Sequence, residues 1–266
     1  MPSSTPQSGP PSGPPSGPPS GPPGQTPPPE PPNHQSPEGP TAAELFPPDG
    51  GGIAPFWPTH LIDIFIEPQA FFSPKAALGK PIYLAMAVLM AGLSQGISRI
   101  DRLLLDTQIV GTKTNWEELS PILQSWPKFW VTNLIGGALA GILLWIISGW
   151  WFRMRIRLSG DPKPDPKLAR IVFIYAFLVR AIPHLALVLF WTVSHSNYGE
   201  AFNNQGVALS LLLTAAFGFG ELFSAYSGIM TFFSVERDRA RLWFIFAPAV
   251  FYGFGLTMII SELMGV

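Results

Sequence analysis

The chain contains no cysteine, which excludes a disulfide framework, a thiolate zinc site and a thiol nucleophile. It is also poor in charge, because only 12% of its 266 residues are Asp, Glu, Lys or Arg, about half the fraction usual in soluble domains. The net charge is −1, so the chain has no excess of positive charge with which to bind a nucleic acid. These absences argue against a disulfide-stabilised fold, a zinc knuckle and a nucleic-acid-binding protein.

Common enzyme signatures are missing too. The sequence has no GxGxxG, GxxxxGK[ST], HExxH or GxSxG pattern. Of the four histidines, only His184 lies inside a long apolar segment, whereas His34, His60 and His195 lie in the tail, the entry segment and an outer loop. We therefore predict a non-enzymatic protein with no catalytic residue, no cofactor and no metal site.

The chain is instead rich in apolar and aromatic residues. Hydrophobic residues make up 47% of it, with nine Trp and twenty Phe, and aromatic rings of this kind anchor proteins at the membrane interface. Its composition divides into a head rich in Pro, Gly and Ser and a remainder dominated by apolar runs. We predict three regions: a cytoplasmic tail over 1–58, an interfacial segment over 59–80 and a membrane domain over 81–266.

The N-terminal tail repeats the motif SGPP four times between Ser8 and Pro23. A period of four excludes collagen, which needs glycine at every third position. Proline and glycine raise the cost of ordering and offer little apolar surface to bury, so the tail is predicted to be disordered. It acts either as a solvated tether or, through spacings such as Pro11 and Pro14, as a ligand for a proline-binding partner. No signal peptide is recognisable at the start.

Five apolar segments are long enough to cross a bilayer core of about 30 Å, which takes roughly 20 helical residues. They are 81–98, 129–152, 171–194, 207–235 and 242–261. The runs are continuous and do not alternate, which favours helices over strands. The predicted fold class is therefore an all-α integral membrane protein with five transmembrane helices in a compact bundle, surrounded by the lipid bilayer.

The distribution of Lys and Arg predicts the orientation of these spans. With five spans, eleven of the sixteen basic residues fall on the N-terminal side of the membrane, four fall on the other side, and Arg180 lies inside a span. We therefore expect a cytoplasmic N-terminus and an outward-facing C-terminus. The segment HLIDIFIEPQAFF, from His60, places Leu61, Ile62, Phe65 and Ile66 close together on a helix. It predicts an interfacial amphipathic helix broken at Pro68, or a segment packed on the bundle.

Several of these features together resemble the Yip family, five-span membrane proteins named for their interaction with Ypt/Rab GTPases. The resemblance covers about 61–263. It depends on the entry IFIEPQAFF, on the exit WWFRMRIRLSG from the second span, and on the loop DPKPDPKLARIVFIYAF before a third span with an internal proline. The pattern is closest to the bacterial members, which implies a prokaryotic plasma membrane. The family implies membrane organisation, vesicle traffic or partner recruitment, and brings no catalytic residue with it.

Two charges lie inside predicted spans, Arg180 in the third and Glu221 in the fourth. An intramembrane charge costs about 2.5 kcal/mol or more and is a functional-site hypothesis by default. Counting from the cytoplasmic ends places both at similar depth, and Gly218, Ser224, Ala225 and Gly228 put Glu221 on a packing face. We predict an ion pair between them. Two alternatives stay open: Arg180 reaching the interface, or both residues lining an aqueous pathway.

His184 follows Arg180 by one helical turn, on the same face. It is predicted to be a hydrogen-bonded core histidine, with a proton relay to Glu221 as the alternative. Arg153, Arg155 and Arg157 alternate with apolar residues at the membrane edge. They either fix the topology or contact anionic lipid. Two GxxxG spacings, at Gly92/Gly96 and Gly137/Gly141, favour internal helix packing and leave a homo-oligomer as the alternative.

Three hypotheses about function follow from the sequence. The first is a Yip-like scaffold that recruits partners through its tail or its basic loops. The second is a small transporter or channel that uses Arg180 and Glu221. The third, a membrane enzyme, is disfavoured because no acid, base and nucleophile cluster in the sequence.

Overall fold

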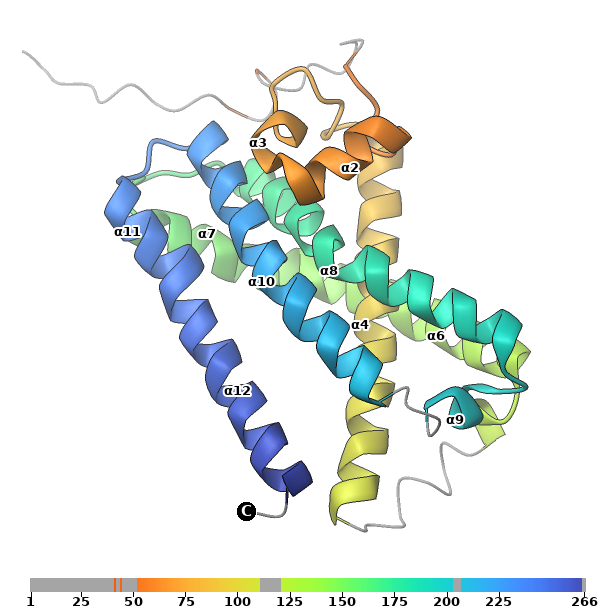
Figure 1. Ribbon diagram of the computed structural model, residues 1–266. Helices are drawn as coiled ribbons and strands as arrows, with labels where there is room; N and C mark the ends of the chain where they lie inside the picture. The colour runs from red at the N-terminus through yellow and green to blue at the C-terminus, as the bar shows by residue number, and fades with distance from the viewer. Residues whose placement is uncertain (1–40, 42–43, 45–51, 111–120, 203–206, 265–266) are drawn as a thin grey trace, which may run out of the picture. The chain divides into compact units, whose positions relative to one another are not determined.

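The computed structural model describes residues 41, 44, 52–110, 121–202 and 207–264 (Figure 1). The SGPP repeats and most of the predicted 1–58 tail lie outside these residues. The described part is α-helical and contains no strand beyond one isolated bridge between Ile53 and Ala76. Its elements are α2 (Pro58–Ile66), α3 (Pro68–Phe71), α4 (Pro81–Val110), α6 (Trp126–Leu143), η1 (Leu144–Ser148), α7 (Gly149–Leu158), α8 (Pro166–Ser194), α9 (Tyr198–Ala201), α10 (Val207–Phe232), α11 (Arg237–Arg241), η3 (Leu242–Phe246) and α12 (Ala247–Met264).

Three helical stretches are long and apolar enough to cross a membrane, namely 81–105, 126–158 and 166–194. They correspond to the first three predicted spans, and each is longer than predicted because polar or charged residues continue the helix. The remaining two predicted spans form α10 and η3–α12 and are not among the three that meet this criterion within the described residues. The all-α class is confirmed, with three helices suited to cross a membrane, and the count of five spans stays a prediction.

Proline and side-chain caps determine where several helices begin. Pro58, Pro68 and Pro166 stand in the first turn of α2, α3 and α8, where a missing backbone N–H costs nothing. At α8 the Asp165 carboxylate also accepts a hydrogen bond from the Leu168 backbone nitrogen at 2.8 Å. Glu67, which precedes Pro68, adopts φ −135° and ψ 69° and separates α2 from α3. The predicted break at Pro68 is therefore present, one residue earlier, because proline disfavours a helical conformation in its predecessor.

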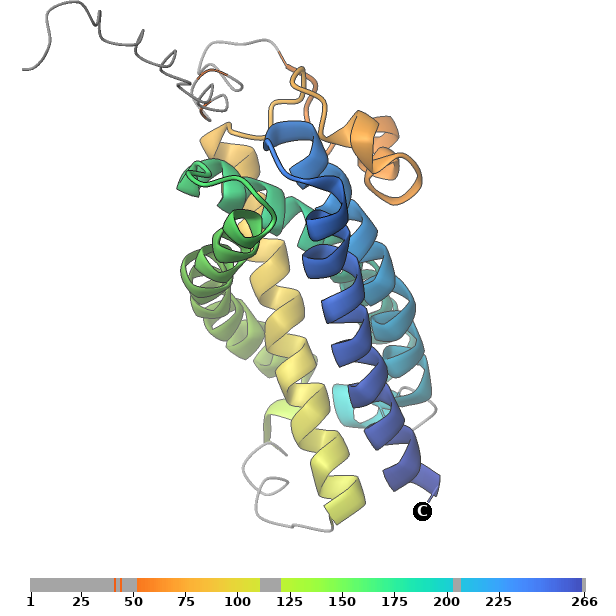
Figure 2. The ribbon, with the colours of Figure 1, turned by 90° about the vertical axis from the view of Figure 1, so that its left-hand side faces the viewer.

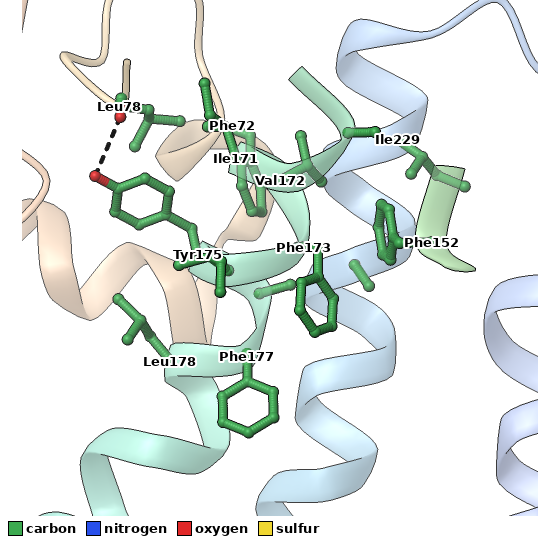
Figure 3. Close-up of a cluster of buried hydrophobic side chains, with 14 of the residues drawn as sticks. Phe72, Leu78, Phe152, Ile171, Val172, Phe173, Tyr175, Phe177, Leu178 and Ile229 are labelled. Atoms are coloured by element: carbon green, nitrogen blue, oxygen red, sulfur yellow. Dashed lines mark hydrogen bonds between the residues drawn. The ribbon is translucent and has the colours of Figure 1, made fainter. Parts of the chain in front are cut away.

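Helix α8 is the central helix of the described part. Between Leu168 and Val179 almost every side chain is buried, because α4 and α7 pack on it as well as α10. Figure 2 shows α6 and α7 on one side of α4 and α10 on the other. Phe72, Phe152, Phe173 and Tyr175 belong to the apolar cluster in Figure 3, where the Tyr175 hydroxyl donates to the Leu78 carbonyl at 3.2 Å. The first half of α8 is apolar on all sides because other elements pack on all of its sides.

The two GxxxG motifs pack against each other between α4 and α6. A methyl group added at Gly92 would collide with the Gly137 carbonyl oxygen and lie 2.6 Å from the Gly141 nitrogen. A methyl group added at Gly141 would lie 2.5 Å from the Val88 carbonyl oxygen. Small residues are what allow helix backbones to approach this closely. Both motifs are therefore used inside the chain, as the packing interpretation predicts.

The two basic loops lie at the same end of the bundle. The Glu236 backbone nitrogen donates to the Ser159 carbonyl at 2.8 Å, which joins the turn after α7 to the turn before α11. Gly160 has φ 114°, a conformation that other residues rarely adopt. We call the end of the bundle that carries these two basic loops the basic end. Helices α2 and α3 also lie there, since Phe72 makes an edge-on ring contact with Phe232, the last residue of α10.

Candidate functional site: two buried polar clusters

Helices α8 and α10 bring Arg180 and Glu221 together. The Arg180 Nε and Glu221 Oε2 atoms are 3.3 Å apart, and their side chains are only 18% and 12% exposed. The Arg180 guanidinium also lies over the Phe177 ring, 4.4 Å from its centroid. The two helices approach closely at Gly228, where an added methyl group would lie 2.5 Å from Val172. The charge of Arg180 is therefore compensated inside the bundle, and the alternative in which it reaches the interface is not what the structure shows.

The prediction that small residues form the packing face of α10 is confirmed for only part of the helix. Ser224 and Ala225 are buried and Gly228 packs on α8, but Gly218 has no atom within 4 Å of an added methyl group. The helices therefore pack most closely at the part of α10 nearer the basic end. Glu221 lies at the edge of this contact.

Arg155 differs from the other two arginines of the α7 run. Its guanidinium lies between the Phe152 and Phe244 rings, 5.2 and 4.6 Å from their centroids. Its Nη1 donates to the Trp243 carbonyl at 3.4 Å. Trp243 belongs to η3, a π-helical turn, which has a looser hydrogen-bond pattern than an α-helix. Arg153 donates from Nε to the Pro164 carbonyl at 3.0 Å, and Arg157 is exposed. Arg155 thus does not belong to a lipid-facing set with Arg153 and Arg157, because its side chain turns inward.

Two buried polar atoms near Glu221, Arg155 Nε and Ser224 Oγ, have no hydrogen-bond partner among the described residues. Glu221 Oε2 has none beyond its 3.3 Å ion-pair contact with Arg180 Nε. Ser224 follows Glu221 by three positions on α10, which places both on one helix face. Buried polar groups are nearly always hydrogen-bonded, so each exception calls for a partner such as water or an ion. We call Arg155, Arg180, Glu221 and Ser224 the Glu221 cluster.

A second cluster surrounds Asp101 of α4. Its carboxylate accepts hydrogen bonds from the Tyr198 hydroxyl, from Ser210 Oγ at 3.1 Å and from His184 Nε2 at 3.2 Å. The other ring nitrogen of His184, Nδ1, is 3.2 Å from Ser94 Oγ. These side chains come from α4, α8, α9 and α10. We call Ser94, Asp101, His184, Tyr198 and Ser210 the Asp101 cluster.

The Asp101 cluster is well shielded from solvent. Ser94, His184 and Tyr198 are nearly or completely buried, and the Asp101 side chain is 13% exposed. Burial, the charge of Asp101 and the hydrogen bond to it all raise the pKa of Tyr198 well above its usual value of 10.0. Tyr198 therefore stays protonated, and its hydroxyl donates to Asp101 at any physiological pH. The cluster combines one carboxylate, one imidazole and three hydroxyls, which suits proton and hydrogen-bond chemistry.

Sequence reasoning predicted a hydrogen-bonded core histidine at His184, and the structure shows hydrogen bonds to both of its ring nitrogens. It bonds to Asp101 and Ser94, however, whereas Glu221 pairs with Arg180. The missed residue was Asp101, because the first span was predicted to end at residue 98. One signal was available: Ser94 and Asp101 are seven positions apart, which places them on one face of a helix that continues past 98.

Comparison with protein-family models, with curated proteins and with solved structures found no match for this chain. The resemblance to the Yip family therefore stays a prediction from the sequence. Within the described residues, no group of three or more His, Asp or Glu side chains is arranged to hold a metal ion. The chemistry of the candidate site is thus that of the two polar clusters themselves.

Proposed function

We propose that this protein is a non-enzymatic, Yip-like membrane-organising protein with five transmembrane helices. In this proposal the basic end and the N-terminus face the cytoplasm, the C-terminus lies outside, and α2 inserts into the cytoplasmic leaflet. The membrane is a prokaryotic plasma membrane, and the tail and basic loops are available to recruit a protein partner.

The observation that carries the proposal is the exposed apolar face of α2. Ile62 and Ile66 are 52% and 77% exposed, and Phe65 and Trp57 beside them are 36% and 64% exposed. The opposite face of the same helix is buried through His60 and Ile64, so α2 is fixed to the bundle. A helix of this kind lies in the membrane interface with its apolar face among the lipids. Inserted on one side only, it enlarges one leaflet relative to the other and favours curvature.

The two buried clusters support a scaffold that keeps α2 in a defined position. Arg180–Glu221 joins α8 to α10, and the Asp101 cluster joins α4 to α8, α9 and α10. Small-residue contacts between α4 and α6 complete the bundle. Such contacts restrict the sliding of helices past one another, which a curvature-generating protein needs if insertion of α2 is to deform the bilayer.

The test is reconstitution of the full-length chain into liposomes, with vesicle diameter measured by electron cryomicroscopy. Wild-type protein is expected to yield smaller or tubulated vesicles as the protein-to-lipid ratio rises. The double variant Ile62→Ser/Ile66→Ser should lose this effect while retaining helicity and incorporation. A matched control is Leu189→Ser/Val193→Ser, which changes two exposed residues at the same helical spacing near the far end of α8.

Two results would overturn the proposal. One is wild-type vesicles that match protein-free vesicles in diameter at every protein-to-lipid ratio. The other is equal loss of the effect in the α2 double variant and in the α8 control, since that would indicate a general response to apolar surface and not a role for α2.

The unpaired polar atoms of the Glu221 cluster favour a second candidate, a small transporter or channel. Arg155 Nε and Ser224 Oγ each require a partner, and water along a pathway would supply one. Ion or proton flux into dye-loaded liposomes tests this candidate directly. Flux that exceeds that of empty liposomes and is abolished in Glu221→Gln would favour transport over the scaffold. Equal flux in wild-type and empty liposomes would eliminate it for the ions tried.

A further inference from the structure

We infer that His184, held between Ser94 and Asp101, is a reversible proton-binding site of this protein. The inference does not depend on the proposed membrane-organising function. It rests on the hydrogen bonds made by the two ring nitrogens of His184, both of which have a partner in the described structure. The ligand is a proton taken from water, and the site is Nδ1 of a buried imidazole.

The neutral form of His184 is fully satisfied by its neighbours. In that form Nε2 carries the hydrogen and donates to Asp101 Oδ2 at 3.2 Å. Nδ1 then accepts a hydrogen bond from the Ser94 hydroxyl at 3.2 Å. The Asp101 carboxylate is ionised and keeps its bonds from Tyr198 and Ser210. Counting His184 and Asp101, the cluster then carries a charge of −1.

The protonated form is satisfied by the same neighbours. Nε2 continues to donate to Asp101, and the added proton sits on Nδ1, which becomes a donor to Ser94 Oγ. A serine hydroxyl can reverse its role because it has one hydrogen and two lone pairs. Freed from Nδ1, the Ser94 hydrogen can be donated to the backbone carbonyl one turn earlier in α4, at Met90. The imidazolium and the carboxylate then form an ion pair, and the charge changes from −1 to zero.

Ser94 is the feature that distinguishes a proton-binding site from an ordinary buried histidine. An apolar residue at position 94 would leave Nδ1–H without an acceptor after protonation, at the cost of a buried unsatisfied donor. A residue with only donors would oppose protonation directly. Only a group that both donates and accepts leaves the two states comparably hydrogen-bonded, and Ser94 is such a group, at 1% exposure.

The other charged and titratable groups around His184 leave this change of state unobstructed. Asp101 of α4 contacts its ring, Tyr198 of α9 contacts Asp101, and Arg180 lies one turn earlier on α8, paired with Glu221 of α10. Arg180, one turn before His184, pairs with Glu221 at 3.3 Å, so its positive charge is offset locally. Tyr198 remains a neutral donor to Asp101. Asp101 is thus the carboxylate that bonds to His184, and it also accepts hydrogen bonds from α9 and α10.

The experiment is an NMR pH titration of histidine ring signals in the full-length protein, labelled at histidine and held in lipid nanodiscs. The signal of His184 is identified by its loss in His184→Gln. We expect it to titrate reversibly while the protein remains folded. Ser94→Ala should weaken proton binding by about two- to tenfold, the equivalent of one hydrogen bond. Ser94→Thr, which retains the hydroxyl, should restore wild-type binding.

Two further variants test the partners. Asp101→Asn removes the negative charge and keeps an oxygen acceptor, so it should weaken proton binding by about tenfold or more. Ser194→Ala is the matched control: exposed Ser194 has its Oγ 3.0 Å from Nδ1 of a different histidine, His195, so this variant should leave His184 unchanged. A His184 signal that stays in one protonation state throughout the folded range would overturn the inference. So would an identical titration in wild type, Ser94→Ala and Asp101→Asn. If Ser94→Ala does not fold, Asp101→Asn alone decides between these outcomes.

Discussion

At the scale of single residues, the buried charges are compensated in two different ways. Glu221 meets an opposite charge, Arg180, on the neighbouring helix. Asp101 meets three hydrogen-bond donors. A buried ion pair is costly to break from one side because the remaining charge loses its partner, whereas a carboxylate with several donors can lose one and keep the others. The two clusters should therefore respond differently to substitution.

Breaking the Arg180–Glu221 pair tests the response of the Glu221 cluster. Glu221→Gln and Arg180→Leu should each lower the free energy of unfolding by about 2–4 kcal/mol, since each leaves a charge buried without its partner. The double variant should cost clearly less than the sum of the two. The measurement is detergent-based unfolding of the three variants and wild type. Additive costs would mean that the two side chains do not interact, in spite of their 3.3 Å separation.

Substitution of Tyr198 tests the response of the Asp101 cluster. Tyr198→Phe removes one donor to Asp101 and should cost about 1–2 kcal/mol. The raised pKa of Tyr198 sets the pH range: in the unfolded chain the phenol ionises near 10.0, and in the folded protein it ionises only at higher pH. The cost should therefore be constant between pH 6 and 9. Wild-type stability should fall above about pH 10, because ionisation then favours the unfolded chain, and Tyr198→Phe should show less of this fall.

At the scale of helices, the contact between α4 and α6 depends on glycine at defined positions. Gly92→Ala should destabilise the protein by about 1–3 kcal/mol, because the added methyl group meets the backbone of Gly137 and Gly141. Gly136→Ala, at the residue next to Gly137 on α6, is the matched control. An added methyl group there has no atom within 4 Å. It should be neutral or stabilising by up to about 1 kcal/mol, since alanine favours the helix. Equal effects of the two variants in thermal unfolding would contradict this packing.

The elements themselves could be predicted well from sequence, and their lateral contacts less well. Continuous apolar runs and the pairing of two GxxxG motifs are local patterns, so the three long helices and their internal packing followed from them. Arg180 and Glu221 could be paired because counting from the helix ends gave their depth. Asp101 and Arg155 could not be placed, because each stands just beyond the end of a predicted span, where a polar residue is ordinary, although both helices continue past these positions. Which way such a side chain turns is decided by partners distant in sequence: His184 and Tyr198 for Asp101, and Trp243 for Arg155.

At the scale of the whole molecule, the lack of cysteine makes the topology directly testable. Single cysteines can be introduced without any background from the natural chain. Lys163→Cys and Asp238→Cys lie at exposed positions of the basic end, and Ser196→Cys lies at an exposed position after α8. A membrane-impermeant maleimide should label the first two from the cytoplasmic side and the third from outside. Labelling of Lys163→Cys and Ser196→Cys from the same side would contradict the proposed orientation.

The two π-helical turns carry a consequence for how this chain tolerates insertions and deletions. Each of η1 and η3 holds its helix wider than an α-helix over five residues. Deleting one residue from 242–246 would let this turn close as an ordinary α-helical turn, because a π-helical turn holds about one residue more than an α-helical turn. The side of α12 that faces its neighbours would then stay nearly where it is, whereas an inserted residue would rotate α12 by about 100°, the angle of one residue. We expect each of these two short stretches to tolerate the loss of one residue better than the gain of one.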